Sequence, residues 1–597
     1  SAVLSLGLVG LTATWVLTRP EAGWTTIVWG QYGIFMVPGR TEALAGLLGG
    51  VAVVCAGMLA ARIAALRWLP HALLAAVLGL CLFLVVPGLV GPVRLDAVAY
   101  HELLPMEAHY GVLLGDRLQL TAGAPLVDVV EPRYGFLWPV LSAMVERATG
   151  PFTLGQNIRL VQMTQVLCLG VFALALLIQA RGAMLGVAVA LLLAAPWLST
   201  AHMAVFHPNQ AGFRFIGLAL TLLALAVCAR RPVPARGEPF LLGGVAGVAL
   251  LVNYETGIAA GAGVATFLTL RHLPRHGWGG WLGVVARAAA AFLAAHAAYW
   301  GLAAIVLGQP PRPLAGLFWP LYSDNLEAAL GLAAYFDLWM LFIACAAALM
   351  FARTTMIARL RAPSAEAALL AGTGAILLVW VAYWASRPHW WNDWSYLFLS
   401  GPFVVAALRP AHLRQALAWT RRGLPPAWLL AVACGLGPAA WVSQAQILPA
   451  AAATARAALA PAPADARLVS GVLMNTATAD RLAAKAAAVS AAAGTGRVAY
   501  ISAHQFSIAV LSGQPMPFAV REMLYGIKTP AQFDGFVADV RAYAPAVILI
   551  DSEGPPNDLT PAQRRMFDAL GAAFAPDYKF DGESNGWRVL RRTTPKP

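Results

Sequence analysis

The chain has 597 residues, of which 59% are hydrophobic and 12% charged, and its net charge is +13. A soluble domain carries about 25% charged residues, so this composition excludes an ordinary soluble protein and indicates a polytopic membrane protein. The positive charge does not indicate nucleic-acid binding, because the arginines stand between apolar segments and form no long basic tract.

About thirteen apolar segments are predicted to cross the membrane as helices, since a bilayer core needs roughly 20 apolar residues per helix. The first is interpreted as a span and not as a removed signal peptide, because no basic region precedes it. The stretch 239–270 fits either two spans or one broken span. The segments are 1–17, 41–66, 69–92, 160–180, 182–205, 212–229, 239–253, 257–270, 282–307, 330–352, 366–386, 395–409 and 427–447.

One set of alternate loops between these segments is rich in arginine: Arg62, Arg67, Arg181, Arg230, Arg231, Arg236, Arg271, Arg275, Arg353, Arg359, Arg361, Arg409, Arg414, Arg421 and Arg422. Cytoplasmic loops carry the excess of Lys and Arg, so these loops and the N-terminus are predicted to be cytoplasmic. The opposite loops are rich in carboxylates, His, Trp and Asn and are predicted to face outward. They are 93–159, 206–211, 253–256, 308–329, 387–394 and everything after 447.

All six cysteines fall in apolar segments, without metal-ligand spacing. They are interpreted as small buried hydrophobic residues, so neither a disulfide framework nor a zinc site is indicated. These residues are Cys55, Cys81, Cys168, Cys228, Cys345 and Cys434.

The largest outward loop, 93–159, is acidic and contains no lysine. Its stretch EAHYGVLLGDRLQLTAGAP is predicted to form an amphipathic interfacial helix that ends at Gly123 and Pro125. A carboxylate facing a cavity at membrane depth can act as a general base, since burial raises its pKa toward neutrality. The alternative is a solvated loop with ordinary surface acids. The acids are Asp96, Glu102, Glu107, Asp116, Asp128, Glu131 and Glu146.

The stretch EPRYGFLWP, Glu131–Pro139, opens the next apolar region. Arg133 offers the bidentate donor geometry that suits phosphate. Because the membrane part contains no lysine, arginine and histidine must provide any anion binding there. The alternative is an interfacial belt of Arg, Tyr and Trp that anchors the following span.

Four further polar motifs stand at outward ends: FHPNQAGFRF, NYETG, WPLYSDN and SRPHWWNDW. Glu255 lies between two apolar stretches, where a charge is costly and therefore a functional candidate. Arg214 could neutralise an anionic head group. The group Arg387, His389, Trp390, Trp391 and Asp393 combines cation, aromatic and acid. For each motif alone, an aromatic belt with snorkelling arginine is the competing interpretation.

The chain beyond residue 447 has a different composition. An Ala/Pro-rich linker, 448–465, is predicted to precede an outward α/β domain over 466–597. RVAYIS and AVILID are predicted to be buried strands, AQFDGFVADVRAYA an amphipathic helix, and DYKFD with WRVLRR a closing hairpin. We find no phosphate-binding loop, dinucleotide fingerprint or nucleophile elbow in this domain, which is interpreted as accessory.

The succession of EAHYGVLLGDRLQLTAGAPLVD and EPRYGFLWP resembles the first outward loop of the GT-C superfamily of lipid-linked-sugar glycosyltransferases, in particular the group of aminoarabinose transferases and protein mannosyltransferases. The likeness covers 94–139, with weaker support at FHPNQAGFRF and SRPHWWND. It implies a GT-C-like membrane module over 1–447, in a bacterial inner membrane, that performs inverting transfer from a polyprenyl-phosphate sugar to an extracytoplasmic glycan, lipid or protein.

The resemblance also implies residue roles. Glu107 matches the acid that serves as general base, with Asp96 as its rival, and Arg133, Arg214 and Arg387 would hold the donor phosphate. Met106 stands where many members have Asp, and Arg133 replaces a Lys. No metal is required, although the acids could hold a divalent cation. Further substrate contacts are expected from Glu102, His109, Tyr110, Asp128, Glu131, Tyr134, His207, Glu255, His389, Trp391 and Asp393.

Three other functions fit parts of this pattern. A lipid-linked glycan polymerase or ligase would use the same donors, but such proteins usually place their large loop late in the chain. A transporter or flippase is disfavoured by the absence of an inverted repeat and by the soluble outer domain. A non-catalytic assembly protein is the third alternative.

Overall fold

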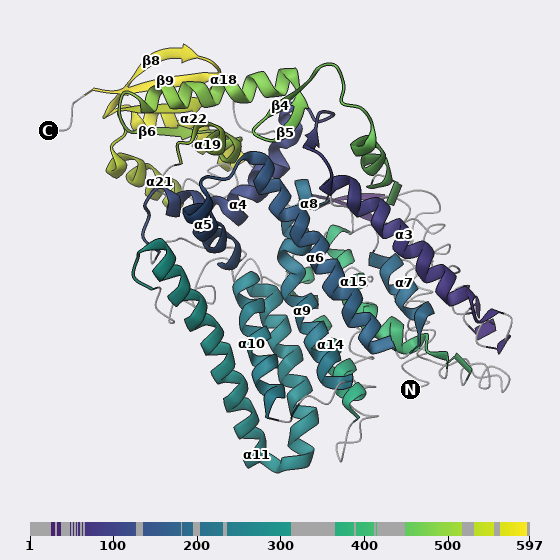
Figure 1. Ribbon diagram of the computed structural model, residues 1–597. Helices are drawn as coiled ribbons and strands as arrows, with labels where there is room; N and C mark the ends of the chain where they lie inside the picture. The colour runs from purple at the N-terminus through teal and green to yellow at the C-terminus, as the bar shows by residue number, and fades with distance from the viewer. Residues whose placement is uncertain are drawn as a thin grey trace.

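The computed structural model describes most of the membrane helices, the first outward loop and the C-terminal region (Figure 1). The described residues are 25–29, 33–37, 48, 52, 55–56, 58–59, 62–63, 66–126, 135–180, 182–194, 203–230, 234, 236–311, 364–386, 390–410, 413–414, 448–449, 451–515, 530–553 and 561–593.

Helices dominate the membrane part, which makes the chain a polytopic integral membrane protein. Among the described residues, four helical segments are long and apolar enough to cross a bilayer: Leu69–Leu89, Leu154–Ala180, Pro208–Arg230 and Tyr254–Leu307. Shorter apolar helices stand beside them. The bundle helices are α3 (Leu69–Leu89), α6 (Leu154–Ala180), α7 (Met184–Ala194), α9 (Gly212–Arg230), α10 (Gly237–Val252), α11 (Tyr254–Leu307), α14 (Ala365–Ser386) and α15 (Trp390–Ala407).

The predicted segments 69–92, 160–180 and 212–229 coincide with described helices, whereas 1–17, 330–352 and 427–447 lie outside the described residues. The total of about thirteen spans therefore stays a prediction. A two-stranded hairpin, β1 (Thr25–Trp29) with β2 (Gly33–Val37), was not expected from the sequence.

The stretch 239–270 forms two helices. Asn253 separates them with extended backbone, φ −162° and ψ 133°, and its side chain accepts a 2.9 Å hydrogen bond from the Thr256 amide, which caps α11. A helix start needs such an acceptor because its first amides have no partner inside the helix. α11 itself turns back at Gly277, whose φ of 63° and ψ of −175° are non-helical, so its two legs correspond to two of the predicted spans (Figure 1).

The second leg of α11 packs closely on α10. A side chain at Gly243 would overlap the backbone carbonyl of Ala288, whereas a Cβ at the neighbouring Gly244 would meet nothing within 4 Å. Small residues let membrane helices approach through their backbones, and dispersion then holds them together.

We expect Gly243→Ala to lower the melting temperature of the purified protein in detergent, because overpacking a close contact costs about 1–3 kcal/mol. Gly244→Ala is the matched control. It should leave the melting temperature unchanged or slightly higher, since alanine is favoured over glycine in a helix by about 1 kcal/mol. Equal melting temperatures for both variants would contradict the close packing of α10 on α11.

The C-terminal region is an α/β unit whose predicted strands are present. β6 pairs with β7 in parallel, and β9 pairs antiparallel with both β7 and β8, giving the strand order β6-β7-β9-β8. The hairpin turns at Asn585 and Gly586, both with positive φ, as a tight two-residue turn demands. The elements are β6 (Val498–Ile501), β7 (Val547–Asp551), β8 (Tyr578–Ser584), β9 (Trp587–Arg592), α18 (Thr476–Ala493), α19 (Gln505–Ser512), α21 (Pro530–Tyr543) and α22 (Pro561–Phe574).

The C-terminal unit is built into the membrane part. β3 (Val93–Leu95), from the first outward loop, pairs in parallel with β5 (Val472–Asn475), which also pairs with β4 (Ala466–Val469). At the start of α6, the amide of Gly155 donates a 2.8 Å hydrogen bond to Ser470 O. One hydrophobic core therefore runs from the membrane helices into this unit, and the unit lies at the same end of the bundle as the first outward loop (Figure 1).

Candidate functional site

Helix α4 (Leu104–Thr121) is the predicted interfacial helix of the first outward loop. It follows a 3-10 turn, η3 (Tyr100–Leu103), in which the Glu102 carboxylate accepts a 2.8 Å hydrogen bond from the Ala99 amide. Glu102 is exposed and serves this turn. α4 then presents different side chains to two neighbours, the C-terminal unit and the connection between α8 and α9.

One face of α4 meets helix α19. Glu107 is 2% exposed, and it accepts a 2.9 Å hydrogen bond from the Ser507 amide and another from the Ser507 hydroxyl. His504 Nδ1 lies 3.9 Å from Glu107 Oε1, and Tyr110 packs on Phe506 with ring centroids 5.5 Å apart. The carboxylate stabilises the positive end of the α19 dipole and joins the loop to the C-terminal unit.

The other face of α4 carries His109. Its Nδ1 lies 2.6 Å from Pro105 O and 3.0 Å from Phe206 O. A carbonyl oxygen only accepts, so Nδ1 carries the proton and Nε2 keeps its lone pair. Burial lowers the pKa of the imidazole below its ordinary value, which keeps the ring neutral at pH 7. Its ring meets that of His207 edge to face at 5.3 Å.

Arg214 and Glu255 form an ion pair at the same end of the bundle. Arg214 stands in the first turn of α9, and its Nη2 donates to Glu255 Oε2 in the first turn of α11. The Arg214 side chain is fully buried and that of Glu255 is 18% exposed. The guanidinium lies 5.3 Å from the Trp380 ring, and its Nη1 is 3.4 Å from Asn209 O.

These residues form one connected group. The short elements α8 (Met203–Phe206) and η6 (Pro208–Gln210) contact His109 at one end and Arg214 at the other. The group thus combines a neutral imidazole, a guanidinium and a partly exposed carboxylate. A guanidinium can bind a ligand phosphate, and a neutral imidazole can accept the proton of a reacting hydroxyl. We call it the outer polar cluster: His109, His207, Asn209, Arg214 and Glu255.

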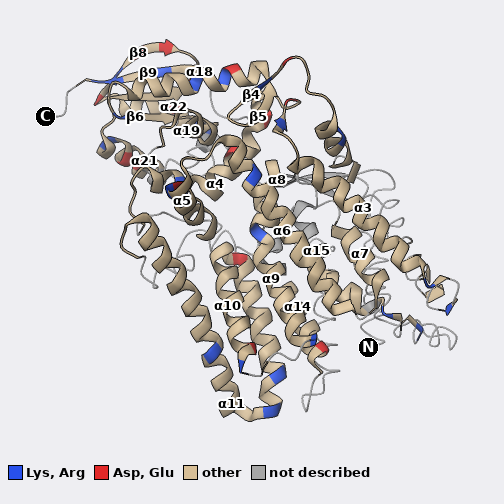
Figure 2. Cartoon of the chain, in the orientation of Figure 1, with Lys and Arg blue, Asp and Glu red and all other residues tan. Residues whose placement is uncertain are grey.

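The opposite end of the bundle has its own ion pairs. Glu238 in α10 is bound by Arg271 Nε at 2.8 Å and by His272 Nε2 at 3.0 Å. Figure 2 shows that the helices between the two ends are mostly uncharged. The Arg271–Glu238 pair resembles the Arg214–Glu255 pair chemically but lies far from the first outward loop, which makes it a natural control.

Asp96, the second predicted catalytic acid, follows β3 directly. Arg94 binds both of its oxygens, with Nε 2.9 Å from Oδ1 and Nη2 2.7 Å from Oδ2. This pairing holds the pKa of the Asp96 carboxyl below its ordinary value. Arg94 also donates to Ala460 O. The pair therefore ties the loop to the segment that leads into the C-terminal unit.

The structure brings His109, His207, Arg214 and Glu255 together, while Glu107 and Tyr110 face α19. The backbones of Trp391 and Asp393 lie in α15. The remaining predicted site residues lie outside the described part of the chain: Asp128, Glu131, Arg133, Tyr134, Arg387 and His389.

The sequence did not indicate the groups that fix these side chains. Asn209 was visible in FHPNQAGFRF, but the backbone carbonyls of Phe206 and Asn209 act through their oxygens, which no residue type reveals. Ser507 and His504 gave no signal, because they stand about 400 positions from Glu107. Within the described residues, no group of three or more His, Cys, Asp or Glu is placed to hold a metal ion.

No protein-family model matches this chain, and neither does any curated protein. Two solved structures of ArnT from Cupriavidus metallidurans are similar to it, one in the apo state and one bound to undecaprenyl phosphate. Sequence identities are 16% and 15%, TM-scores 0.34 and 0.36, and each alignment covers 88% of this chain and 98% of the other. ArnT is an aminoarabinose transferase of the GT-C type, the group that the loop motifs resemble. Both TM-scores lie below 0.5, so the function has to be inferred from this chain's own residues.

Proposed function

We propose that the protein is a membrane glycosyltransferase of the GT-C type. It transfers a sugar from a polyprenyl-phosphate donor to a glycan, lipid or protein on the outer side of a bacterial inner membrane. The observation that carries this proposal is the outer polar cluster, in which the neutral imidazole of His109 and the Arg214–Glu255 pair are joined through the segment 206–210. Charged groups at membrane depth are costly and mark substrate sites.

Arg214 is assigned to the donor phosphate. Its guanidinium is held by Glu255 and by the face of Trp380, so its orientation is fixed before a ligand arrives. A lipid phosphate would compete with the Glu255 carboxylate for the planar set of N–H donors on the Arg214 guanidinium. Displacement of the partly exposed Glu255 carboxylate by the phosphate would leave the guanidinium paired throughout, which avoids a buried unpaired charge.

The general base must approach from the face of the sugar opposite the phosphate, because inverting transfer displaces the leaving group from behind. Glu255 touches the phosphate-binding arginine and therefore stands on the wrong side. Of the groups on α4, Glu107 is enclosed by Ser507, and it would have to leave α19 to act. His109 offers a neutral imidazole with an available Nε2, which is the form a general base requires. We therefore assign the base to His109, with Glu107 and Asp96 as rivals.

In the proposed step, His109 Nε2 takes the proton of the acceptor hydroxyl as its oxygen bonds to the anomeric carbon. The bond from that carbon to the phosphate oxygen breaks, and the electron pair leaves with the polyprenyl phosphate. Arg214 stabilises the charge that grows on the phosphate. The imidazolium then releases its proton to solvent.

The test is a transfer assay with the purified full chain in proteoliposomes, a radiolabelled polyprenyl-phosphate sugar and extracted envelope glycans and lipids as acceptors. We expect a new glycosidic product and release of polyprenyl phosphate. Labelled donor that crosses the bilayer without product would instead identify a flippase. Products that grow by repeating units would identify a polymerase.

A further inference from the structure

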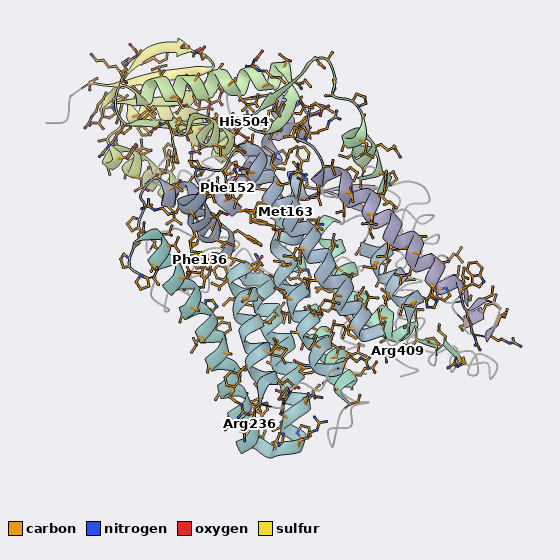
Figure 3. The ribbon with its side chains drawn as sticks, in the orientation of Figure 1. Phe136, Phe152, Met163, Arg236, Arg409 and His504 are labelled. Carbon is orange, nitrogen blue, oxygen red and sulfur yellow. The ribbon has the colours of Figure 1, made fainter. Side chains whose placement is uncertain are left out.

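A cleft of about 870 Å³ lies between the first outward loop and the C-terminal unit, apart from the outer polar cluster. Its walls come from the end of α4, from α5 (Leu137–Thr149), from the end of α11 and from the C-terminal unit. Figure 3 shows Phe152, one of its lining residues, between the membrane helices and the unit that carries His504. The volume is in the range of ligand sites, about 300–1,000 Å³.

The cleft is positively charged. Three arginines line it, Arg117, Arg147 and Arg497, against one acid, Glu146. Arg117 Nη1 lies 3.4 Å from Glu146 Oε1, so these two charges offset each other. Arg147 and Arg497 are exposed, and no acidic partner is found for either among the described residues. Arg497 Nη1 donates a 3.1 Å hydrogen bond to Tyr543 O. Two guanidinium groups at the cleft, one from α5 and one from the C-terminal unit, thus have no acidic partner within the described structure.

Arg117 supplies the second observation. Its side chain is fully buried, and within the described structure its Nε and Nη2 have no hydrogen-bond partner, while Nη1 donates to Asn157 Oδ1. Burial lowers the pKa of Arg117 to about 10, which leaves it charged at pH 7. Two buried donors without an acceptor are costly, and a ligand oxygen that reaches Nε or Nη2 from the cleft reduces that cost.

The other lining groups suit a sugar. Phe152 and Tyr543 offer aromatic faces, and the Tyr543 ring lies 5.5 Å from the Arg497 guanidinium. Gln514 carries an amide that can both donate to and accept from hydroxyls, whereas the Gln309 amide is held by the backbone of Ala124 and Leu126. A cleft with guanidinium, aromatic and amide groups matches a saccharide with a phosphate or carboxylate better than it matches a simple inorganic anion.

Helix α5 connects the cleft to the outer polar cluster. Near its start, Trp138 Nε1 donates a 2.6 Å hydrogen bond to Phe213 O, next to Arg214, and near its end Arg147 lines the cleft. Nine residues at 1.5 Å each place the backbones of Trp138 and Arg147 about 14 Å apart along the helix. A ligand held in the cleft thus has to extend toward the cluster to react there.

We propose that the cleft binds the acceptor of the transfer, an extended anionic saccharide whose charged group lies in the cleft and whose reacting hydroxyl reaches the outer polar cluster. This assignment of acceptor class rests on the proposed function. The charged group can belong to a free glycan or to a phosphorylated glycolipid, and the same guanidinium groups bind it in both.

The first experiment measures binding without turnover. Isothermal titration of the full chain in detergent compares glucose 1-phosphate, glucose and inorganic phosphate, and phosphorylated glycolipid in nanodiscs forms a separate arm. We expect glucose 1-phosphate to bind best of the three soluble probes and the double variant Arg147→Ala/Arg497→Ala to weaken it at least tenfold. The arm that shows the larger loss in this variant identifies the free or the lipid-linked source.

Two matched variants make this result specific. Arg591→Ala removes an exposed arginine paired with Asp581 on the C-terminal unit, away from the cleft, and should leave binding unchanged. The loss caused by the double variant should persist when it is measured in an Arg214→Ala background, which separates binding in the cleft from binding at the donor site. Equal affinity for phosphate and glucose 1-phosphate, or unaltered binding in the double variant, would overturn the proposal.

A transfer assay separates this proposal from the proposed function. If both hold, the double variant raises KM for the acceptor at least tenfold and leaves KM for the donor unchanged. If the double variant transfers sugar with wild-type kcat and KM, the acceptor role of the cleft is wrong, while the proposed transferase function stands. If the wild-type protein transfers no sugar, the proposed transferase function is wrong, and so is the acceptor role of the cleft. This holds even if the titration shows that the cleft binds a saccharide.

Discussion

Replacing His109 with glutamine is expected to lower kcat for sugar transfer by about 100- to 10,000-fold, the usual contribution of a general base. The glutamine amide can still donate to the carbonyls of Pro105 and Phe206, so the local structure is kept. What is lost is the lone pair of Nε2. The measurement is the single-turnover rate with saturating donor and acceptor.

The pH profile gives an independent readout of the same residue. Because burial lowers the pKa of His109 below its ordinary value of 6.5, its imidazole is unprotonated at pH 7 and becomes protonated only on acidification through the lowered pKa. A base must be unprotonated to work, so kcat/KM should stay level at pH 7 and fall only on acidification through the lowered pKa. In the glutamine variant this acidic limb should disappear.

Glu107→Gln is the comparator, because the motif resemblance assigns the base to that residue. Glutamine keeps an oxygen that accepts from Ser507, so the contact with α19 is largely preserved. We expect transfer per folded molecule to remain within a few-fold of the wild-type rate. The reverse result, with Glu107→Gln inactive and His109→Gln active, would return the base to Glu107 and require α19 to move during catalysis.

Much of the secondary structure follows from local chemistry. The strands at 498–501 and 547–551 are short continuous apolar runs, and they are buried as such runs predict. The polar interruption at Asn253 could be recognised as a break, but deciding between one broken span and two helices required the backbone angles of that residue.

The sequence could indicate which residues belong to the candidate site, but not what each of them does there. Costly polar residues at outward ends pointed to His109, His207, Arg214 and Glu255. Their roles depend on partners distant in the chain: Phe206 O, 97 positions from His109, fixes the histidine tautomer, and Ser507, 400 positions from Glu107, encloses the carboxylate. Hydrophobic periodicity carries no information about such contacts. The same holds for the pairing of β3 with β5, which makes the C-terminal unit part of the site's framework.

Arg214→Ala is expected to reduce kcat/KM for the donor by about 10- to 100-fold, since a charged hydrogen bond to phosphate contributes about 1.5–3 kcal/mol and about 1.4 kcal/mol corresponds to a factor of ten. Arg214→Lys should recover little of this loss, because an ammonium cannot reproduce the planar fork that Glu255 and the Trp380 face hold in place. Donor titration in the transfer assay measures both variants.

Loss of the Arg214–Glu255 ion pair also destabilises the protein. A control variant is therefore needed that loses a similar ion pair away from the donor site. Arg271→Ala removes the corresponding arginine at the other end of the bundle, where Glu238 is 1% exposed. Both alanine variants should therefore lower the melting temperature in detergent, because each leaves a carboxylate that is buried (Glu238) or partly buried (Glu255) without its arginine. Only Arg214→Ala should change kcat/KM when rates are expressed per folded molecule. Equal losses in the two variants would show that Arg214 acts through stability alone.

Glu255→Gln tests whether the carboxylate and the donor phosphate compete for Arg214. The glutamine side-chain oxygen can still accept from the guanidinium, but its charge is gone, so it is a weaker competitor for the arginine. KM for the donor should therefore fall while kcat changes little. A rise in KM would show instead that Glu255 is needed to position Arg214 in the bound state. In that case the phosphate would have to bind beside the ion pair. The proposal that phosphate displaces Glu255 would be wrong, even if Arg214 remains the phosphate ligand.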